Sequence, residues 1–103
     1  MSDREIITGY RENLIAIRMY RESINWNQRH GLPLFNLPEQ ITALIRNISR
    51  FEEIIEAIPD LRTRNILRCR YALGWTNTDT GIYMNMSRNV VQRIAKDALD
   101  RMR

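Results

Sequence analysis

The sequence has one cysteine, Cys69, and one histidine, His30, among its 103 residues. A single cysteine forms no internal disulfide, which excludes a disulfide-stabilised secreted scaffold and favours a reducing compartment. His30 stands beside a helix-ending glycine and Cys69 falls on an apolar helical face, so they supply neither a catalytic triad nor a set of metal ligands. We therefore expect a protein that is not an enzyme, with no catalytic residue, metal, cofactor or small-molecule substrate.

Glycine and proline are scarce, with four and three residues, and long hydrophobic runs are missing. So few turn-forming residues argue against a β-sandwich or barrel, whereas the Ile, Leu, Met, Arg and Glu content suits long helices. No stretch approaches the roughly 18 apolar residues that a membrane span needs, and the N-terminus has no apolar signal core. The sequence thus predicts an all-α, cytoplasmic protein that has no membrane contact.

Lysine occurs once, at Lys96, whereas arginine occurs fifteen times. The formal net charge of +4 and the pI near 9.8 favour a polyanionic partner. The planar guanidinium fork is suited to phosphates and to guanine edges. Residues 1–59 carry seven arginines and eight acidic residues, whereas residues 60–103 carry nine basic and four acidic residues. The positive charge is therefore expected on the C-terminal unit.

Residues 3–29 contain no proline and one glycine, and apolar residues recur in them at helical spacing. The stripe consists of Ile7, Tyr10, Leu14, Ile17 and Ile24. It predicts one long helix that ends at His30 and Gly31, where glycine can form a left-handed cap. The connector 32–38 is too rich in proline to be helical, and its leucine and phenylalanine side chains are expected to pack inward.

The next segment has the most regular periodicity of the chain, with apolar residues three and four positions apart. This seam consists of Ile41, Leu44, Ile48, Phe51, Ile55 and Ile58. Leu37, Ile45 and Ile54 widen it, which favours packing on the first helix as an antiparallel hairpin over an extended coiled coil. We assign residues 1–58 to this hairpin, and we expect a homodimer with contacts at the edge of the seam.

Residues 59–103 predict a second unit. A helical pattern resumes after Pro59 and stops at Gly74, and a short helix is expected over residues 77–84. Asn85 suits a left-handed turn, and Ser87 suits the N-cap of a helix over residues 88–102. A short helix, a tight turn and a capped helix with basic first turns are typical of a helix-turn-helix, whose last helix enters the major groove of DNA.

Two strings of this unit, ILRCRYALGWT at residues 66–76 and MNMSRNVVQRIAKDAL at residues 84–99, resemble region 4 of bacterial sigma factors. They are also similar to that region as found in small phage late-transcription regulators of the ArpU/RinA type, which place a helical hairpin before it. The resemblance implies a recognition helix with a buried face. That face would comprise Val91, Ile94, Ala98 and Leu99, packed on Ile66, Leu73, Met84 and Met86.

The resemblance also implies which residues touch DNA. Base contacts are implied for Arg88, Asn89, Gln92 and Arg93. Their chemistry fits, because arginine reads guanine O6 and N7, while asparagine and glutamine pair with adenine. Phosphate contacts are expected from Thr76, Thr78, Ser87, Lys96, Arg101 and Arg103.

Three departures from the family pattern limit what can be transferred. Thr80 and Gly81 stand where the family has an aliphatic residue and alanine, which indicates a looser first helix. Asn85 replaces the usual turn glycine, and Asn89 replaces an acid, so the target sequence does not carry over. Nothing in the chain corresponds to the regions that melt a promoter, which indicates a regulator or accessory rather than a complete sigma factor.

The sequence therefore predicts a sequence-specific, double-stranded DNA-binding transcription regulator of phage or prophage origin that reads the major groove with the helix 88–102. For the arginines of that helix, an ordinary solvated face is the plain alternative. Two other classes stay open. One is a non-catalytic adaptor that binds host RNA polymerase or another host protein, and the other is a small terminase subunit, which also joins a helix-turn-helix to oligomerising helices.

Overall fold

The computed structural model describes residues 1–102 as an assembly of helices without a strand in that range, which confirms the all-α prediction. The elements are α1 (Asp3–Thr8), α2 (Tyr10–Arg29), α3 (Leu37–Glu56), α4 (Leu61–Leu67), the π-helical turn η1 (Arg68–Ala72), α5 (Asn77–Met84) and α6 (Arg88–Asp100). The predicted helix 88–102 thus ends two residues early, and Arg103 lies outside the described residues. No helix of residues 1–102 is both long and apolar enough to cross a membrane.

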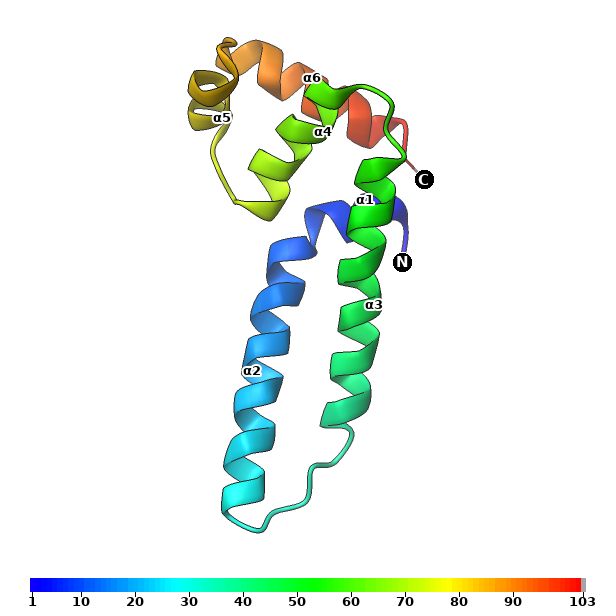
Figure 1. Ribbon diagram of the computed structural model, residues 1–103, viewed down its shortest axis with the longest axis vertical. Helices are drawn as coiled ribbons and strands as arrows, with labels where there is room; N and C mark the ends of the chain where they lie inside the picture. The colour runs from blue at the N-terminus through cyan, green and yellow to red at the C-terminus, as the bar shows by residue number, and fades with distance from the viewer. Residues whose placement is uncertain (103) are drawn as a thin grey trace.

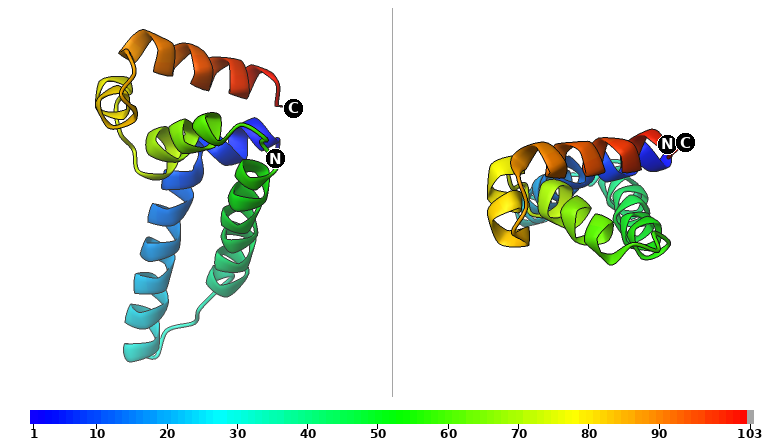
Figure 2. Two further views of the ribbon diagram at one scale, coloured as in Figure 1. Left: turned by 45° about the horizontal axis from the view of Figure 1, so that its top comes forward. Right: turned by 90° about the horizontal axis from the view of Figure 1, so that it is seen from above.

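The molecule is elongated, with principal extents of 54 × 26 × 16 Å. Figure 1 shows α2 and α3 running antiparallel as a long arm, while α1, α4, η1, α5 and α6 gather at one end as a head. Both chain ends lie at the head, and Figure 2 shows α6 crossing over the end of the arm. The arm is two helices wide, so each of its helices has one face without an intramolecular partner.

The predicted single helix over residues 3–29 is wrong, because the chain bends at Gly9 into α1 and α2. Gly9 has φ −94° and ψ 4°, and its N–H donates to the carbonyl oxygen of Glu5 at 2.9 Å. A Cβ at Gly9 would stand 3.0 Å from that same oxygen, so only a glycine turns there without crowding. The bend directs Ile6 and Ile7 into the head, where both are buried.

The core lies where arm and head meet. Its fully buried side chains come from both predicted units: Ile7, Phe51, Ile55, Ile66, Leu67 and Val91. Fully burying each such side chain stabilises the fold by about 1.5–3 kcal/mol. Tyr10 stacks on Phe51, with ring centroids 4.0 Å apart, and closes the core on the arm side. Residues 1–58 and 59–103 therefore share one hydrophobic cluster.

The prediction that the connector packs inward is wrong for Leu32 and Phe35, whereas Leu34 and Leu37 are half-buried, and Leu37 and Pro38 already belong to α3. Leu32 is 46% exposed and Phe35 is 77% exposed, because the connector runs around the free end of the arm, where no other element covers it. Phe35 also has a positive φ of 54°. The connector is held by polar contacts instead, including a hydrogen bond from the Asn27 side-chain amide to the carbonyl oxygen of Pro33 at 3.0 Å.

The prediction that Leu73 is buried in the same apolar face as Ile66 is also wrong, since Leu73 is 54% exposed. The cause is η1, which widens the last turn so that the Leu73 N–H bonds to the carbonyl oxygen of Arg68, five residues back, at 2.9 Å. This shift rotates residue 73 off the apolar face. The chain then ends the helix at Gly74, which has a φ of 74°.

Candidate nucleic-acid interface

The interface is built on two N-caps and one left-handed residue. Thr76 caps α5, its side-chain oxygen accepting from the Asp79 N–H at 3.0 Å. Asn85 has φ 56° and ψ 49°, which ends α5 with a left-handed turn. Ser87 caps α6, its oxygen accepting from the Val90 N–H at 3.3 Å. The predicted short helix, turn conformation and Ser87 cap are therefore confirmed.

Small residues let the turn close tightly against α5. Thr80 and Gly81 are buried, and the N–H of Met86 donates to the carbonyl oxygen of Gly81 at 2.8 Å. A Cβ on Gly81 would stand 2.5 Å from the carbonyl oxygen of Met86, so alanine would not fit without a shift of backbone. The small residues at these two positions thus allow a close approach of the turn to α5.

The inner face of α6 agrees with the sequence analysis in most positions. Val91, Ala98 and Leu99 are buried, and Ile94 is half-buried. Ala95 is also buried, at 4% exposed. The sequence analysis missed Ala95, although its place four residues after Val91 and four before Leu99 is the signal of the same face. Of the implied partners, Ile66 is buried and Met84 and Met86 are half-buried.

The outer face of α6 carries the residues implied to touch bases. Arg88, Asn89, Gln92 and Arg93 are all exposed and occupy its first two turns. Lys96 follows on the same stripe as Asn89 and Arg93, at intervals of four and three residues. Among the ion pairs of residues 1–102, none involves Arg88, Arg93 or Lys96. These three cations are therefore free to meet an anionic partner.

A shallow groove runs between α5 and the start of α6. It is lined by Thr78, Gly81, Ile82, Asn85, Met86, Ser87 and Arg88. Two of the implied phosphate contacts thus share one depression with one implied base contact. Ile82 is 75% exposed beside it. The sequence did not predict Ile82 or Asn85 in this groove, because Ile82 is an aliphatic residue and Asn85 was predicted only as the turn residue.

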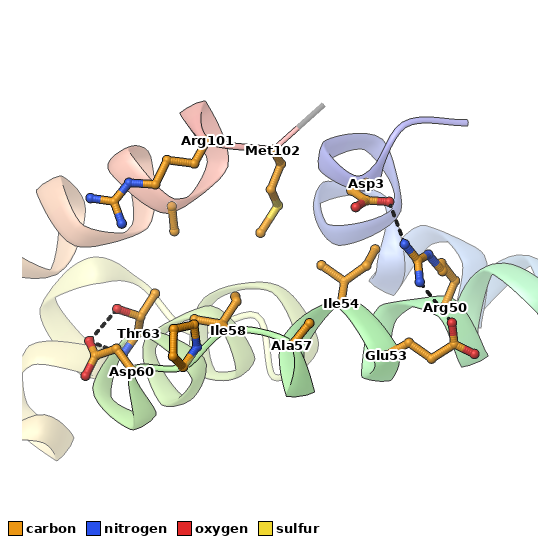
Figure 3. Close-up of a pocket in the computed structure, with 12 residues that line it drawn as sticks. Asp3, Arg50, Glu53, Ile54, Ala57, Ile58, Asp60, Thr63, Arg101 and Met102 are labelled. Atoms are coloured by element: carbon orange, nitrogen blue, oxygen red, sulfur yellow. Dashed lines mark hydrogen bonds and ion pairs between the residues drawn. The ribbon is translucent and has the colours of Figure 1, made fainter.

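Three implied phosphate contacts, Thr76, Lys96 and Arg101, do not line this groove. Thr76 is exposed at the opposite end of α5. Arg101 follows the C-terminal end of α6, thirteen residues and so about 20 Å from Arg88 along the helix. Figure 3 shows Met102 pointing toward Ala57 and Ile58, and Arg101 lying above Thr63. These residues line a cavity of about 490 Å³ that the end of α6 forms with α1, the end of α3 and the start of α4.

The described residues contain few side chains that could bind a metal or act as a nucleophile. Within residues 1–102, no cluster of three or more His, Cys, Asp or Glu side chains could hold a metal ion. Cys69 is buried at 4% exposed, and this burial raises the pKa of its thiol, which lowers the fraction of reactive thiolate. The surface around α6 is suited to binding a charged partner.

Comparison of the chain with protein-family models, with curated proteins and with solved structures found no match in any of the three. The case for a function therefore rests on the residues themselves and on their arrangement around α6.

Proposed function

We propose that the protein is a sequence-specific, double-stranded DNA-binding transcription regulator, and that α5, the Asn85 turn and α6 act as its helix-turn-helix. The observation that carries the proposal is the outer face of α6, where Arg88, Asn89, Gln92 and Arg93 are exposed together on the first two turns. In a helix-turn-helix, these turns of the second helix meet the base edges.

Dimensions and chemistry support this mode of binding. A helix with its side chains is about 10–12 Å across, and the major groove is about 12 Å wide. Arg88 and Arg93 present bidentate donors for guanine O6 and N7, and Asn89 and Gln92 can pair with adenine N6 and N7. One short helix face therefore carries donors and acceptors for both kinds of base pair.

Phosphate contacts would hold α6 in the groove. Thr78 and Ser87 line the depression beside Arg88, and Lys96 lies two turns further along the exposed stripe. Hydroxyl groups, ammonium groups and helix N-termini commonly contact the DNA backbone, which fixes the register of the helix without reading sequence. The hairpin and the sigma-like strings of the sequence support a phage or prophage regulator as the biological setting.

The first experiment is selection of bound duplexes from a random pool by the full-length protein at physiological salt. The proposal predicts enrichment of one motif over successive rounds. An Arg88→Ala, Arg93→Ala double variant should not enrich that motif. Arg46→Ala is the matched control, because Arg46 is exposed on the arm and has no ion pair among residues 1–102. Retention without enrichment, or enrichment that survives the double substitution, would contradict base reading.

An adaptor that binds host RNA polymerase is the second candidate, and one observation favours it. Ile82 and Tyr83 on α5 are 75% and 67% exposed, and Tyr83 meets Trp75 edge to face with ring centroids 5.4 Å apart. Exposed aromatic and aliphatic side chains of this kind are common protein contacts. Capture of core polymerase that survives charge reversal at Arg88 and Arg93 but is lost in Tyr83→Lys would support this function.

A further inference from the structure

The outer face of α2 is apolar and has no partner within the described residues. Ile15 is 56% exposed, Met19 is 60% exposed and Trp26 is 51% exposed. Ile17 is buried and Ile24 is half-buried, and both point toward α3. The exposed stripe therefore faces directly away from α3, on the flank of a two-helix arm.

This stripe has the spacing of a helix-packing seam. Glu12, Ile15, Met19, Glu22, Trp26 and Arg29 follow one another at intervals of three, four, three, four and three residues, and we call them the outer seam. All six side chains are exposed. Such intervals place side chains in line along a helix, as at the a and d positions of a coiled coil.

We propose that the outer seam binds the outer seam of a second copy of this chain, with the two α2 helices antiparallel about a two-fold axis. The charges at the two ends of the seam carry this choice, since Glu12 and Arg29 complement each other when one α2 is reversed. In one antiparallel register, Glu12 faces Arg29 of the second copy and Ile15 faces Trp26 of the second copy. The numbers of any two facing residues then add up to 41. Met19 and Glu22 then lie together at the centre.

The surface of α2 fits this register in a second way. Leu14, Ile15 and Arg18 surround a shallow hollow of about 200 Å³. With Arg11, these residues stand at the i, i+3, i+4 and i+7 positions that receive a knob in knobs-into-holes packing. Trp26 of the second copy falls over this hollow in the same register. Trp26 is held outward by stacking on His30, with ring centroids 4.0 Å apart.

The symmetry doubles each contact, because a two-fold interface uses the same patch on both chains. Two tryptophans would be buried and two Glu12–Arg29 pairs would form. The seam runs over eighteen residues, from residue 12 to residue 29, or about 25 Å along one helix face, and so forms a small interface. The dimer should therefore have a dissociation constant of the order of micromolar.

Other occupants fit the seam less well. Its charged members are two glutamates and one arginine, so it does not suit a polyanion. This interface differs from the contacts expected from the sequence at the edge of the residue 41–58 seam, where Phe51, Ile54 and Ile55 are buried in the core. The inference is independent of DNA binding, since no residue of α6 takes part.

Sedimentation equilibrium of the full-length protein, from about 5 to about 500 µM, tests the interface. The wild type should show a monomer–dimer equilibrium with no larger species. Met19→Glu should raise the dissociation constant at least about tenfold, because it adds a carboxylate opposite Glu22 of the second copy on both chains. Leu61→Glu is the control, since Leu61 is 59% exposed on α4 and should leave the constant unchanged. Circular dichroism would verify that each variant folds.

A charge exchange tests the register. Glu12→Arg and Arg29→Glu should each weaken the dimer about three- to tenfold, and the double variant should recover most of the loss. A monomer at every concentration, a dimer that Met19→Glu leaves intact, or a ring of many copies, as a small terminase subunit would form, would overturn the interface. A dimer that the double exchange does not restore would overturn the antiparallel pairing.

Discussion

The carbonyl oxygen of Met86 lies 2.5 Å from the point where a Cβ atom on Gly81 would stand. Because Met86 also donates its N–H to the carbonyl oxygen of Gly81 at 2.8 Å, residue 81 fixes where the turn crosses α5 and hence where α6 begins. The position of the exposed face of α6 thus depends on a residue that touches no partner.

Gly81→Ala should destabilise the protein by about 1–3 kcal/mol, since the added methyl group overpacks a backbone contact. The direction of the change in the free energy of unfolding distinguishes a close backbone contact from an open helical site. At an unobstructed helical site, replacing glycine with alanine would stabilise the helix by about 0.5–1 kcal/mol. Urea unfolding measured by circular dichroism gives the difference. A variant as stable as the wild type would show that the turn does not close on α5 in this way.

Ser87 caps α6 and also lines the groove beside Arg88, and two variants can separate these roles. Ser87→Ala should lower the free energy of unfolding by about 1 kcal/mol, because α6 loses its N-cap. Ser87→Asp keeps a capping oxygen and should retain most of that stability, yet it places a negative charge in the groove beside Arg88 and should weaken DNA binding. Equal DNA affinity for Ser87→Asp and the wild type would remove this serine from the interface.

The N-cap of α4 predicts a dependence of stability on acid. The Thr63 hydroxyl donates to Asp60 at 2.6 Å, and this bond, with the Thr63 N–H at 3.2 Å, lowers the pKa of Asp60 below its ordinary value of 3.8. A lowered pKa in the folded state means that the contribution is complete above the ordinary value and is lost as the pH falls through the folded value. The free energy of unfolding, measured with urea, should therefore differ less between neutral pH and pH 3 in Asp60→Asn than in the wild type.

Phe35 predicts a stabilising substitution. It has a φ of 54° and is 77% exposed, so it holds a left-handed backbone without burying its ring. Phe35→Gly should raise the free energy of unfolding by about 0.5–1 kcal/mol, since the strain of a side chain there exceeds the extra chain entropy of glycine. Leu32→Gly, at an exposed neighbour with negative φ, should bring no gain. A loss of stability in Phe35→Gly would mean that the ring has a partner.

Local chemistry accounts for the features that the sequence predicted well. Asn85 tolerates a left-handed turn, and Ser87 bonds to the N–H three residues on, so each of these outcomes depends on neighbours in sequence. The buried positions of α6 follow from helical spacing in the same way. All nine residues of the described range that were implied to contact DNA are exposed.

The errors arose where an irregular backbone turn or a distant part of the chain decides the outcome. Gly9 bends the first helix because the core needs Ile6 and Ile7 in the head, and no local pattern distinguishes that glycine from one within a straight helix. Leu73 left the apolar face because η1 inserts a wider turn before it. Phe35 is exposed because the arm has nothing beyond its end. In each case the sequence supplied the apolar residue but not its partner.

The central claim, that α6 reads base edges, is tested most directly by the affinities of Arg93→Ala and Lys96→Ala for the selected duplex and for a random duplex. Arg93→Ala should lose about 1–3 kcal/mol on the selected duplex and far less on the random one, whereas Lys96→Ala should lose equally on both and reduce the salt slope by about one. Equal losses of Arg93→Ala on both duplexes would contradict the claim.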